Sequence, residues 1–356
     1  MKIKILFLIE ELVGGGKERR LVELLKGVSL LENFEIHLAL TKSNVDYKEV
    51  LDLDIHIHHI YGNSNFGLFV VYSKLFKKIK PNHVHSWSYK TSFYTAILKS
   101  FYKFNFIAGF ISDTFSFSTI SGFVAKNIIF KKANHIVSNS KAGLTSYKVP
   151  ANKGFVIYNG FDPSRIEKVL DTNHPTEFER NVTTLNIVML ANVTPYKDYE
   201  TFIRIAKSFT ELREDVTFLS IGNILPEYKT LTDPYLNDNH PKIKFFGFRN
   251  DVSALLNKCD LGVLCSNSEG ISNAIIECMA HGLPIITTDL NGGSKEIIDD
   301  GINGFICSVD ELPEKIDLLL NQEKLRVMMG IKAKEKIITT FSLDIMVKEY
   351  IKLYQI

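Results

Sequence analysis

Two glutamates, Glu269 and Glu277, flank a short turn that the sequence predicts to open a helix. An apolar strand, Leu261–Leu264, precedes this turn, and the first backbone N–H groups of a helix have no acceptor within it. A strand, turn and helix start in this order bind anions. The expected donors are Gly270, Ile271, Ser272 and Asn273. The flanking carboxylates then serve as acceptors for hydroxyl groups, which predicts a sugar-nucleotide site with a sugar at Glu269, a diphosphate on the turn and a ribose at Glu277.

The residues between and after the two glutamates resemble a known family. GISNAII separates the glutamates, and the chain continues from Glu277 as ECMAHGLPIITTDLNGGSKEIIDDGINGF. Both segments are similar to the Glu-x7-Glu region of the retaining glycosyltransferases of family 4, which have the GT-B fold. A surface helix with an ordinary capping turn would explain a bare pair of glutamates. The glycine, asparagine, proline and paired glycines in register favour the transferase interpretation.

The resemblance implies roles for residues elsewhere in the chain. Lys197 matches a lysine that, with an arginine, clamps the donor diphosphate, so Lys197 and Glu269 are the expected catalytic residues. The arginine position holds Asn192, which can donate a hydrogen bond but adds no charge. Gly15 and Gly16 match a loop whose amides approach the donor phosphate, and a flexible turn is the competing explanation for them. Ser294 is a weaker donor-side candidate.

The acceptor side is less defined because the first half of the chain matches the family more loosely. Family members often carry a histidine at the end of the fourth strand, where this chain has Ile111. Ser112 and Asp113 are the adjacent polar alternatives. His85 matches another strand-end position that would face the acceptor, and a structural strand-end residue is the competing interpretation.

No metal site is predicted. Asp52-Leu53-Asp54 has the D-x-D pattern of metal-dependent transferases, but it lies far in sequence from the sugar-nucleotide motif and is attributed to chance. His56 and His58 alternate on one strand face, yet no carboxylate or thiol lies nearby in sequence at ligand spacing, so a half-exposed strand is expected. No cofactor is expected beyond the nucleotide-sugar donor.

The chain is expected to form two α/β domains. Its 356 residues exceed what one hydrophobic core usually supports, and apolar strands alternate with amphipathic helices through both halves. These patterns predict doubly wound parallel sheets, and the resemblance implies the GT-B arrangement of two Rossmann-like domains facing a cleft. The expected parts are an acceptor domain 1–170, a polar linker 171–184, a donor domain 185–340, and a final helix of about 341–356 that packs back on the first domain.

Charge is unevenly distributed along the chain, although the net charge is only +2. Residues 1–165 contain 22 Lys and Arg against 12 Asp and Glu, a net charge of +10, whereas the remainder contains 20 against 28, a net charge of −8. Lysines interleaved with aromatic residues suit an anionic membrane surface, and solvated helix faces explain them equally well. Nucleic acid is disfavoured because arginine is sparse in the basic half and no binding motif is present.

The sequence contains no apolar segment of bilayer-spanning length. Its four cysteines form no CxxC pair, and buried thiols in a reducing compartment are expected. We therefore expect a cytoplasmic protein, either free or peripheral on the inner face of the cytoplasmic membrane.

These patterns together predict a retaining, metal-independent hexosyltransferase that uses a nucleoside-diphosphate sugar, with a UDP-sugar as the first candidate. The expected acceptor is a glycan or lipid-linked glycan in the assembly of cell-surface polysaccharide or lipopolysaccharide. Two alternatives stay open: another GT-B enzyme, such as a sugar-nucleotide epimerase or a phosphorylase, and a non-catalytic nucleotide-sugar-binding partner subunit. Asn192 and Ile111, which depart from the family pattern, support the second alternative.

Overall fold

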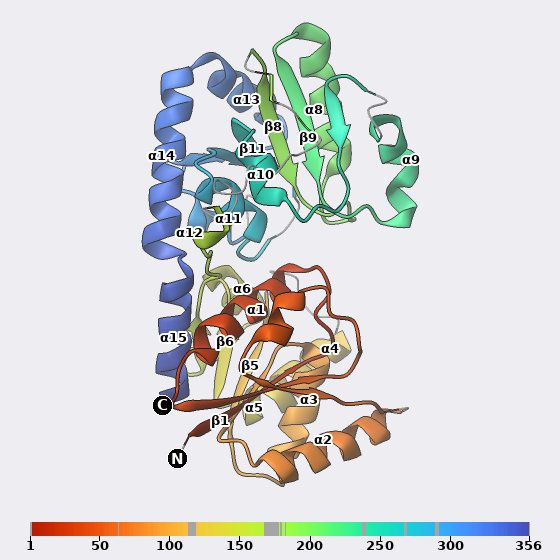
Figure 1. Ribbon diagram of the computed structural model, residues 1–356, viewed down its shortest axis with the longest axis vertical. Helices are drawn as coiled ribbons and strands as arrows, with labels where there is room; N and C mark the ends of the chain where they lie inside the picture. Colours follow the sequence, from red (N-terminus) through yellow and green to blue (C-terminus); the bar gives the residue numbers. More distant parts are fainter. Residues whose placement is uncertain are drawn as a thin grey trace. The chain divides into compact units, whose positions relative to one another are not determined.

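The chain folds into two compact α/β units. The computed structural model describes residues 2–62, 64–112, 119–166, 178, 180–181, 183–236, 240–266, 269–288 and 292–355. Unit 1 comprises Met1–Gly160 and Leu343–Ile356, and unit 2 comprises Phe161–Ser342. Figure 1 draws most of unit 1 in red to yellow, with its C-terminal helix in dark blue, and unit 2 in green to blue. Most of the predicted linker, 171–184, lies outside the described residues.

Unit 1 is built on a seven-stranded sheet with the order β3-β2-β1-β4-β5-β6-β7. Its strands are β1 Ile3–Ile9, β2 Phe34–Leu40, β3 His56–His59, β4 His83–Ser86, β5 Asn105–Ile111, β6 His135–Ser138 and β7 Gly154–Val156. Neighbouring strands pair in parallel, as the continuous apolar runs predict. The strand order reverses between β1 and β4, which makes the sheet doubly wound.

Helices cover both faces of this sheet. They are α1 Gly16–Ser29, α2 Asn65–Ile79, α3 Tyr89–Leu98, α4 Thr119–Val124, α5 Phe130–Lys132, α6 Lys141–Ser146 and α15 Leu343–Gln355, with a 3₁₀ helix at Lys48–Asp52 and a π-helical segment at Ala125–Ile129. One hydrophobic cluster joins the sheet to α1 and α15, and a second joins it to α2, α3 and the α4–α5 region. The helical region from α4 to α5 is interrupted by the π-helical segment at Ala125–Ile129.

The C-terminal helix α15 is an integral part of unit 1. It lies against α1 at Gly27, where an added Cβ would come within 2.3 Å of Val347 Cγ2. Near its end, the hydroxyl of Tyr354 lies 2.8 Å from Nδ1 of His85 on β4. The helix therefore extends a core that begins with the first strand of the chain.

Unit 2 repeats the doubly wound plan with a six-stranded parallel sheet in the order β10-β9-β8-β11-β12-β13. Its strands are β8 Leu185–Leu190, β9 Val216–Ile221, β10 Ile243–Phe245, β11 Leu261–Leu264, β12 Ile285–Thr287 and β13 Gly304–Ile306. Its helices are α8 Tyr199–Leu212, α9 Lys229–Thr232, α10 Val252–Leu256, α11 Asn273–Ala280, α12 Ser294–Ile297, α13 Leu312–Asn321 and α14 Glu323–Thr340, with 3₁₀ helices at Pro226–Tyr228 and Asp233–Tyr235. The order reverses between β8 and β11, where such sheets bind ligands beyond the carboxyl ends of their strands.

The described part of the chain contains no helix that is both long and apolar enough to cross a bilayer.

Candidate functional site

The candidate site lies at the carboxyl ends of the two strands that flank the switch point of unit 2. The loop after β8 carries Asn192 and Lys197, and the loop after β11 carries Glu269. The two loops pair directly, because Lys197 and Ser266 form an antiparallel bridge and the amide of Asp198 donates to the carbonyl of Cys265. The fold thus brings together residues that are more than seventy positions apart.

Lys197 and Glu269 form an ion pair in this site. The Lys197 ammonium donates to Oε1 of Glu269, and the hydroxyl of Ser266 donates to the same oxygen over 2.9 Å. The two charged side chains are 16% and 17% exposed, so water reaches the pair but does not surround it. A cation and a carboxylate in contact offer a ligand both a partner for phosphate and an acceptor for hydroxyl groups.

The turn after Glu269 is held by close backbone packing. The amide of Gly293 donates to the carbonyl of Glu269 over 2.9 Å, and an added Cβ on Gly293 would lie 2.5 Å from the carbonyl oxygen of Gly270. Only glycine fits this approach, which gives the second of the paired glycines in the sequence motif a physical reason. Ser294, the next residue, is buried at the first position of α12.

Helix α11 begins immediately after this turn, with Ser272 as its N-cap. The first intrahelical bond runs from the amide of Ile276 to the carbonyl of Ser272. Gly270, Ile271 and Ser272 are buried, whereas Asn273 is half-buried at the first helical position. The positive end of the helix dipole therefore lies in the same loop as the Lys197–Glu269 pair.

Glu277, one turn further along α11, is held by Arg165. The guanidinium contacts both carboxylate oxygens, with Nη1–Oε1 and Nη2–Oε2 distances of 3.3 Å. Arg165 also lies over the ring of Phe161, 5.3 Å from its centroid, and the Phe161 ring meets His281 edge to face. This two-point contact fixes the orientation of the carboxylate.

One end of the Asn192 side chain makes a structural hydrogen bond. Its side-chain oxygen accepts a hydrogen bond of 2.9 Å from the amide of Asn223, which ties the loop after β8 to the loop after β9. Its exposed side chain retains an amide group with donor capacity but carries no charge. The electrostatic contribution at this position is therefore weaker than that of an arginine.

Comparison with known proteins finds a family similarity for the segment that contains this site. Residues 171–336 match the family described as "Glycosyl transferases group 1". This part of the chain is similar to the group 1 glycosyl transferases. The segment contains both residues of the Lys197–Glu269 pair and Glu277, whereas Arg165 precedes it.

Two curated relatives and one solved structure illustrate the similarity. A Campylobacter jejuni N,N'-diacetylbacillosaminyl-diphospho-undecaprenol alpha-1,3-N-acetylgalactosaminyltransferase is 29% identical over 47% of this chain and 44% of its own. A Bacillus anthracis N-acetyl-alpha-D-glucosaminyl L-malate synthase is 29% identical over 61% of this chain and 58% of its own. The chain thus spans about half the length of these curated relatives. The Anabaena protein HepE, solved in complex with UDP and glucose, superposes with a TM-score of 0.83 and 20% identity over 99% of both chains, which shows the GT-B fold.

Outside the group 1 segment, Gly15 and Gly16 lie at the start of α1 in unit 1. Gly15 is the extended N-cap residue, and its amide donates to the hydroxyl of Tyr47 over 3.2 Å. An added Cβ at Gly15 would lie 2.4 Å from a carboxylate oxygen of Glu18. Gly16 is exposed at the first helical position. The loop lies between strand β1 and helix α1.

The acceptor-side candidates have different environments. Ser112 is half-buried directly after β5, and its carbonyl accepts from the side-chain amide of Asn139 over 3.4 Å. Asp113 lies outside the described residues. His85 is fully buried among Phe7, Trp87 and the tyrosines of α15, and this burial lowers the pKa of its ring well below the usual value. His85 therefore packs β4 against α15 and lines no surface.

Two contacts at the site could not be predicted from the sequence. Arg165 follows the Asn-Gly turn near the domain crossing, but nothing in its local pattern links it to a glutamate 112 residues later. Ser266 precedes the motif as an ordinary strand-end serine, and only the fold shows that it hydrogen-bonds Glu269. A charged residue beside the Asn159-Gly160 turn is the one signal that points to Arg165.

Proposed function

We propose that the chain is a retaining glycosyltransferase that moves a hexosyl group from a nucleoside-diphosphate sugar to an acceptor hydroxyl. The observation that supports this proposal most is the Lys197–Glu269 pair in the loop that opens α11. The site offers a group for each of the three parts of a sugar nucleotide. Lys197 and the start of α11 suit the diphosphate, Glu269 suits the sugar, and Glu277 suits the ribose. The UDP and glucose of the HepE complex make a UDP-sugar the first candidate.

In this proposal, the diphosphate is met by positive charge from two sources. The Lys197 ammonium exchanges its contact with Glu269 for a phosphate oxygen, and the positive end of the α11 dipole faces the same group. Both stabilise the negative charge that grows on the departing diphosphate as the sugar bond breaks. The proposal that no divalent metal is needed rests on this local positive charge, which Asn192 supplements only with a neutral donor.

The two glutamates accept hydrogen bonds from hydroxyl groups of the donor. Glu269, released from Lys197, accepts from the sugar while Ser266 keeps its carboxylate in place. Glu277 accepts from the ribose, because a carboxylate has more acceptor sites than its two contacts with Arg165 use. Retention of the anomeric configuration, with attack by the acceptor on the face that the leaving group departs from, is implied by the family resemblance.

The acceptor is proposed to be a glycan or a lipid-linked glycan of the cell surface. The Campylobacter relative is named for a diphospho-undecaprenol acceptor, and WaaG, which is 14% identical to this chain with a TM-score of 0.70, is described as a glycosyltransferase involved in lipopolysaccharide biosynthesis. Unit 1, with Ser112, is the proposed acceptor side, and Gly15 and Gly16 are proposed to approach the donor phosphate, as the family resemblance implies. Its excess of lysine suits a peripheral position on the anionic inner face of the cytoplasmic membrane.

The proposal is tested with the purified chain and a panel of nucleotide sugars. UDP-glucose and UDP-N-acetylgalactosamine are expected to raise the melting temperature of the protein. When a lipid-linked acceptor is added, we expect the reaction to release UDP and to form an α-linked product. Donor epimerisation or phosphorolysis without transfer would indicate another GT-B enzyme. Tight UDP binding with no turnover on any acceptor would indicate a non-catalytic partner, the alternative that Asn192 favours.

A further inference from the structure

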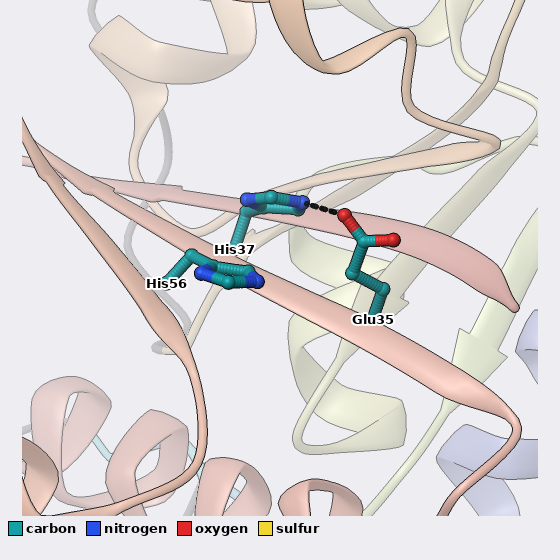
Figure 2. Close-up of side chains that lie close together, drawn as sticks. All are labelled: Glu35, His37 and His56. Carbon is teal, nitrogen blue, oxygen red and sulfur yellow. Dashed lines mark hydrogen bonds and ion pairs between the residues drawn. The ribbon is translucent and has the colours of Figure 1, made fainter.

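Unit 1 contains a cluster of metal-ligating side chains away from the proposed transfer site. Glu35 and His37 lie two residues apart on one face of β2, and His56 begins the edge strand β3 (Figure 2). The parallel register pairs His37 directly with His56. The cluster therefore combines two strands whose contributing residues are about twenty positions apart. Sequence spacing around His56 does not reveal this cluster, because Glu35 and His37 come from the neighbouring strand.

The three side chains are already arranged toward one another. One ligand atom from each lies within 4.8 Å of the other two, and Nε2 of His37 is 3.0 Å from Oε1 of Glu35. The rings of His37 and His56 stack with centroids 4.8 Å apart. His37 is 7% exposed, Glu35 is half-buried and His56 is exposed, so the site has a fixed inner ligand and an open outer side.

We propose that Glu35, His37 and His56 bind a divalent transition-metal ion, with Zn²⁺ as the first candidate. Two imidazoles and one carboxylate form a donor set that zinc accepts, with water in a fourth position. Bonds of about 2.0–2.1 Å in a tetrahedral site place ligand atoms roughly 3.4 Å apart. Small side-chain rotations reach this spacing from the arrangement observed.

His58 supplies a second feature that zinc sites share. A metal-ligating histidine usually donates its other ring N–H to a neighbouring acceptor, which sets the tautomer and the ring orientation. Nδ1 of His37 lies 3.0 Å from Nε2 of His58. With Nε2 of His37 on the metal, its Nδ1–H donates to His58.

Without metal, the same residues form a hydrogen-bonded chain. Lys4 lies 3.0 Å from Oε1 of Glu35, so this ammonium must move away when a metal ion arrives. Its side chain is 35% exposed and can turn into water. A bound ion would then join the edge strand β3 to β2 near the amino ends of these two strands. The Gly15 loop lies at the other end, after β1, so the site acts on stability and not on transfer.

The test uses the full, untagged chain after treatment with a chelator. Calorimetric titration with Zn²⁺ is expected to give one ion per chain, and Co²⁺ is expected to give the visible absorption of a low-coordinate site at the same stoichiometry. Glu35→Gln and His56→Ala are each expected to weaken binding at least tenfold. His58→Phe is expected to keep the stoichiometry and to weaken binding about 10- to 100-fold, as outer-shell changes do.

His59→Ala is the matched control. This exposed histidine directly follows His58 on β3, and its side chain points to the opposite face of the sheet from His56 and His58. Its Zn²⁺ affinity is expected to equal that of the wild type. Because His56 is exposed, His56→Ala tests the proposal even if Glu35→Gln folds poorly. The proposal is overturned if the wild type shows no saturable 1:1 binding, or if His59→Ala loses as much affinity as His56→Ala.

Discussion

At the residue scale, Lys197 is placed to exchange one anion for another. It pairs with Glu269 in the structure and would pair with the diphosphate in the complex. Since the charge on the diphosphate grows as the sugar departs, its contribution should be larger in the transition state than in the bound donor.

We predict that Lys197→Ala lowers kcat for sugar transfer by about 100-fold or more, because losing one oxyanion donor typically costs this much. Donor affinity is expected to change by less than about tenfold. Steady-state kinetics measures kcat and calorimetry measures the donor affinity. Lys324→Ala, at an exposed position on α14, is the control and should behave as the wild type. An unchanged kcat with a raised KM would contradict the catalytic assignment of Lys197.

Glu277 gives a second prediction at the same scale. Glu277→Ala is expected to weaken UDP binding about tenfold or more, equivalent to about 1.4 kcal/mol, because a hydrogen-bonded charge is removed from the ribose. Arg165→Lys keeps the positive charge but loses the two-point contact, so an intermediate loss is expected.

The ribose assignment is separated from a purely structural role by the ligand. Wild-type protein should bind 2′,3′-dideoxy-UDP more weakly than UDP, whereas Glu277→Ala should bind both equally. If the variant still distinguishes the two nucleotides as the wild type does, Glu277 does not contact the ribose.

At the element scale, the turn that presents Glu269 depends on Gly293. Gly293→Ala places a Cβ 2.5 Å from the Gly270 carbonyl, so the turn must shift. We predict a loss of about 1–3 kcal/mol in the free energy of unfolding, which is typical of overpacking, together with weaker UDP binding. Urea unfolding and calorimetry measure the two effects.

Gly301 provides the comparison for this prediction. It has a φ of +75° but open space around it, so Gly301→Asn keeps a residue that tolerates the left-handed conformation. Its stability and UDP affinity are expected to stay near those of the wild type. Equal behaviour of Gly301→Asn and Gly293→Ala would show that the close backbone approach does not control the turn.

The elements were predictable to different degrees for physical reasons. Strands such as β1 and β8 are predictable because each carries an apolar run bounded by turns. Helical periodicity between α4 and α5 does not reveal the π-helical segment at Ala125–Ile129. Short helices such as α10 and α12 have too few residues for a period to show.

Side-chain partnerships were predictable only where a motif linked the segments. The proximity of Lys197 and Glu269 was expected from the family resemblance. The contact between Arg165 and Glu277 and the cluster around His37 depend on which strands and loops become neighbours. Sequence spacing does not contain that information.

At the scale of the whole molecule, buried neutral histidines link stability to pH. Burial, reinforced by Arg20, lowers the pKa of His85 well below the usual 6.5, and burial also lowers the pKa of His83 and His135. Below about pH 6.5 the unfolded chain binds protons that the folded chain does not, so stability falls as pH decreases. Each such group contributes up to about 1.4 kcal/mol per pH unit in this window.

We predict that the free energy of unfolding of unit 1 falls between pH 7 and pH 5. Trp87, the single tryptophan of the chain, is buried in unit 1 beside His85 and reports its unfolding by fluorescence. His85→Gln retains a hydrogen-bonding side chain toward Tyr354, lacks the titration, and should give a shallower pH dependence. Identical slopes for the two proteins would exclude His85 as a source of the effect.

The central claim is that unit 2 holds a nucleoside diphosphate at the start of α11. A crystal structure of the chain in complex with UDP tests this claim most directly. In this complex we expect the diphosphate at the amino end of α11, the Lys197 ammonium on a phosphate oxygen and away from Glu269, and the ribose hydroxyls on Glu277. UDP bound elsewhere, with the Lys197–Glu269 pair unchanged, would contradict it.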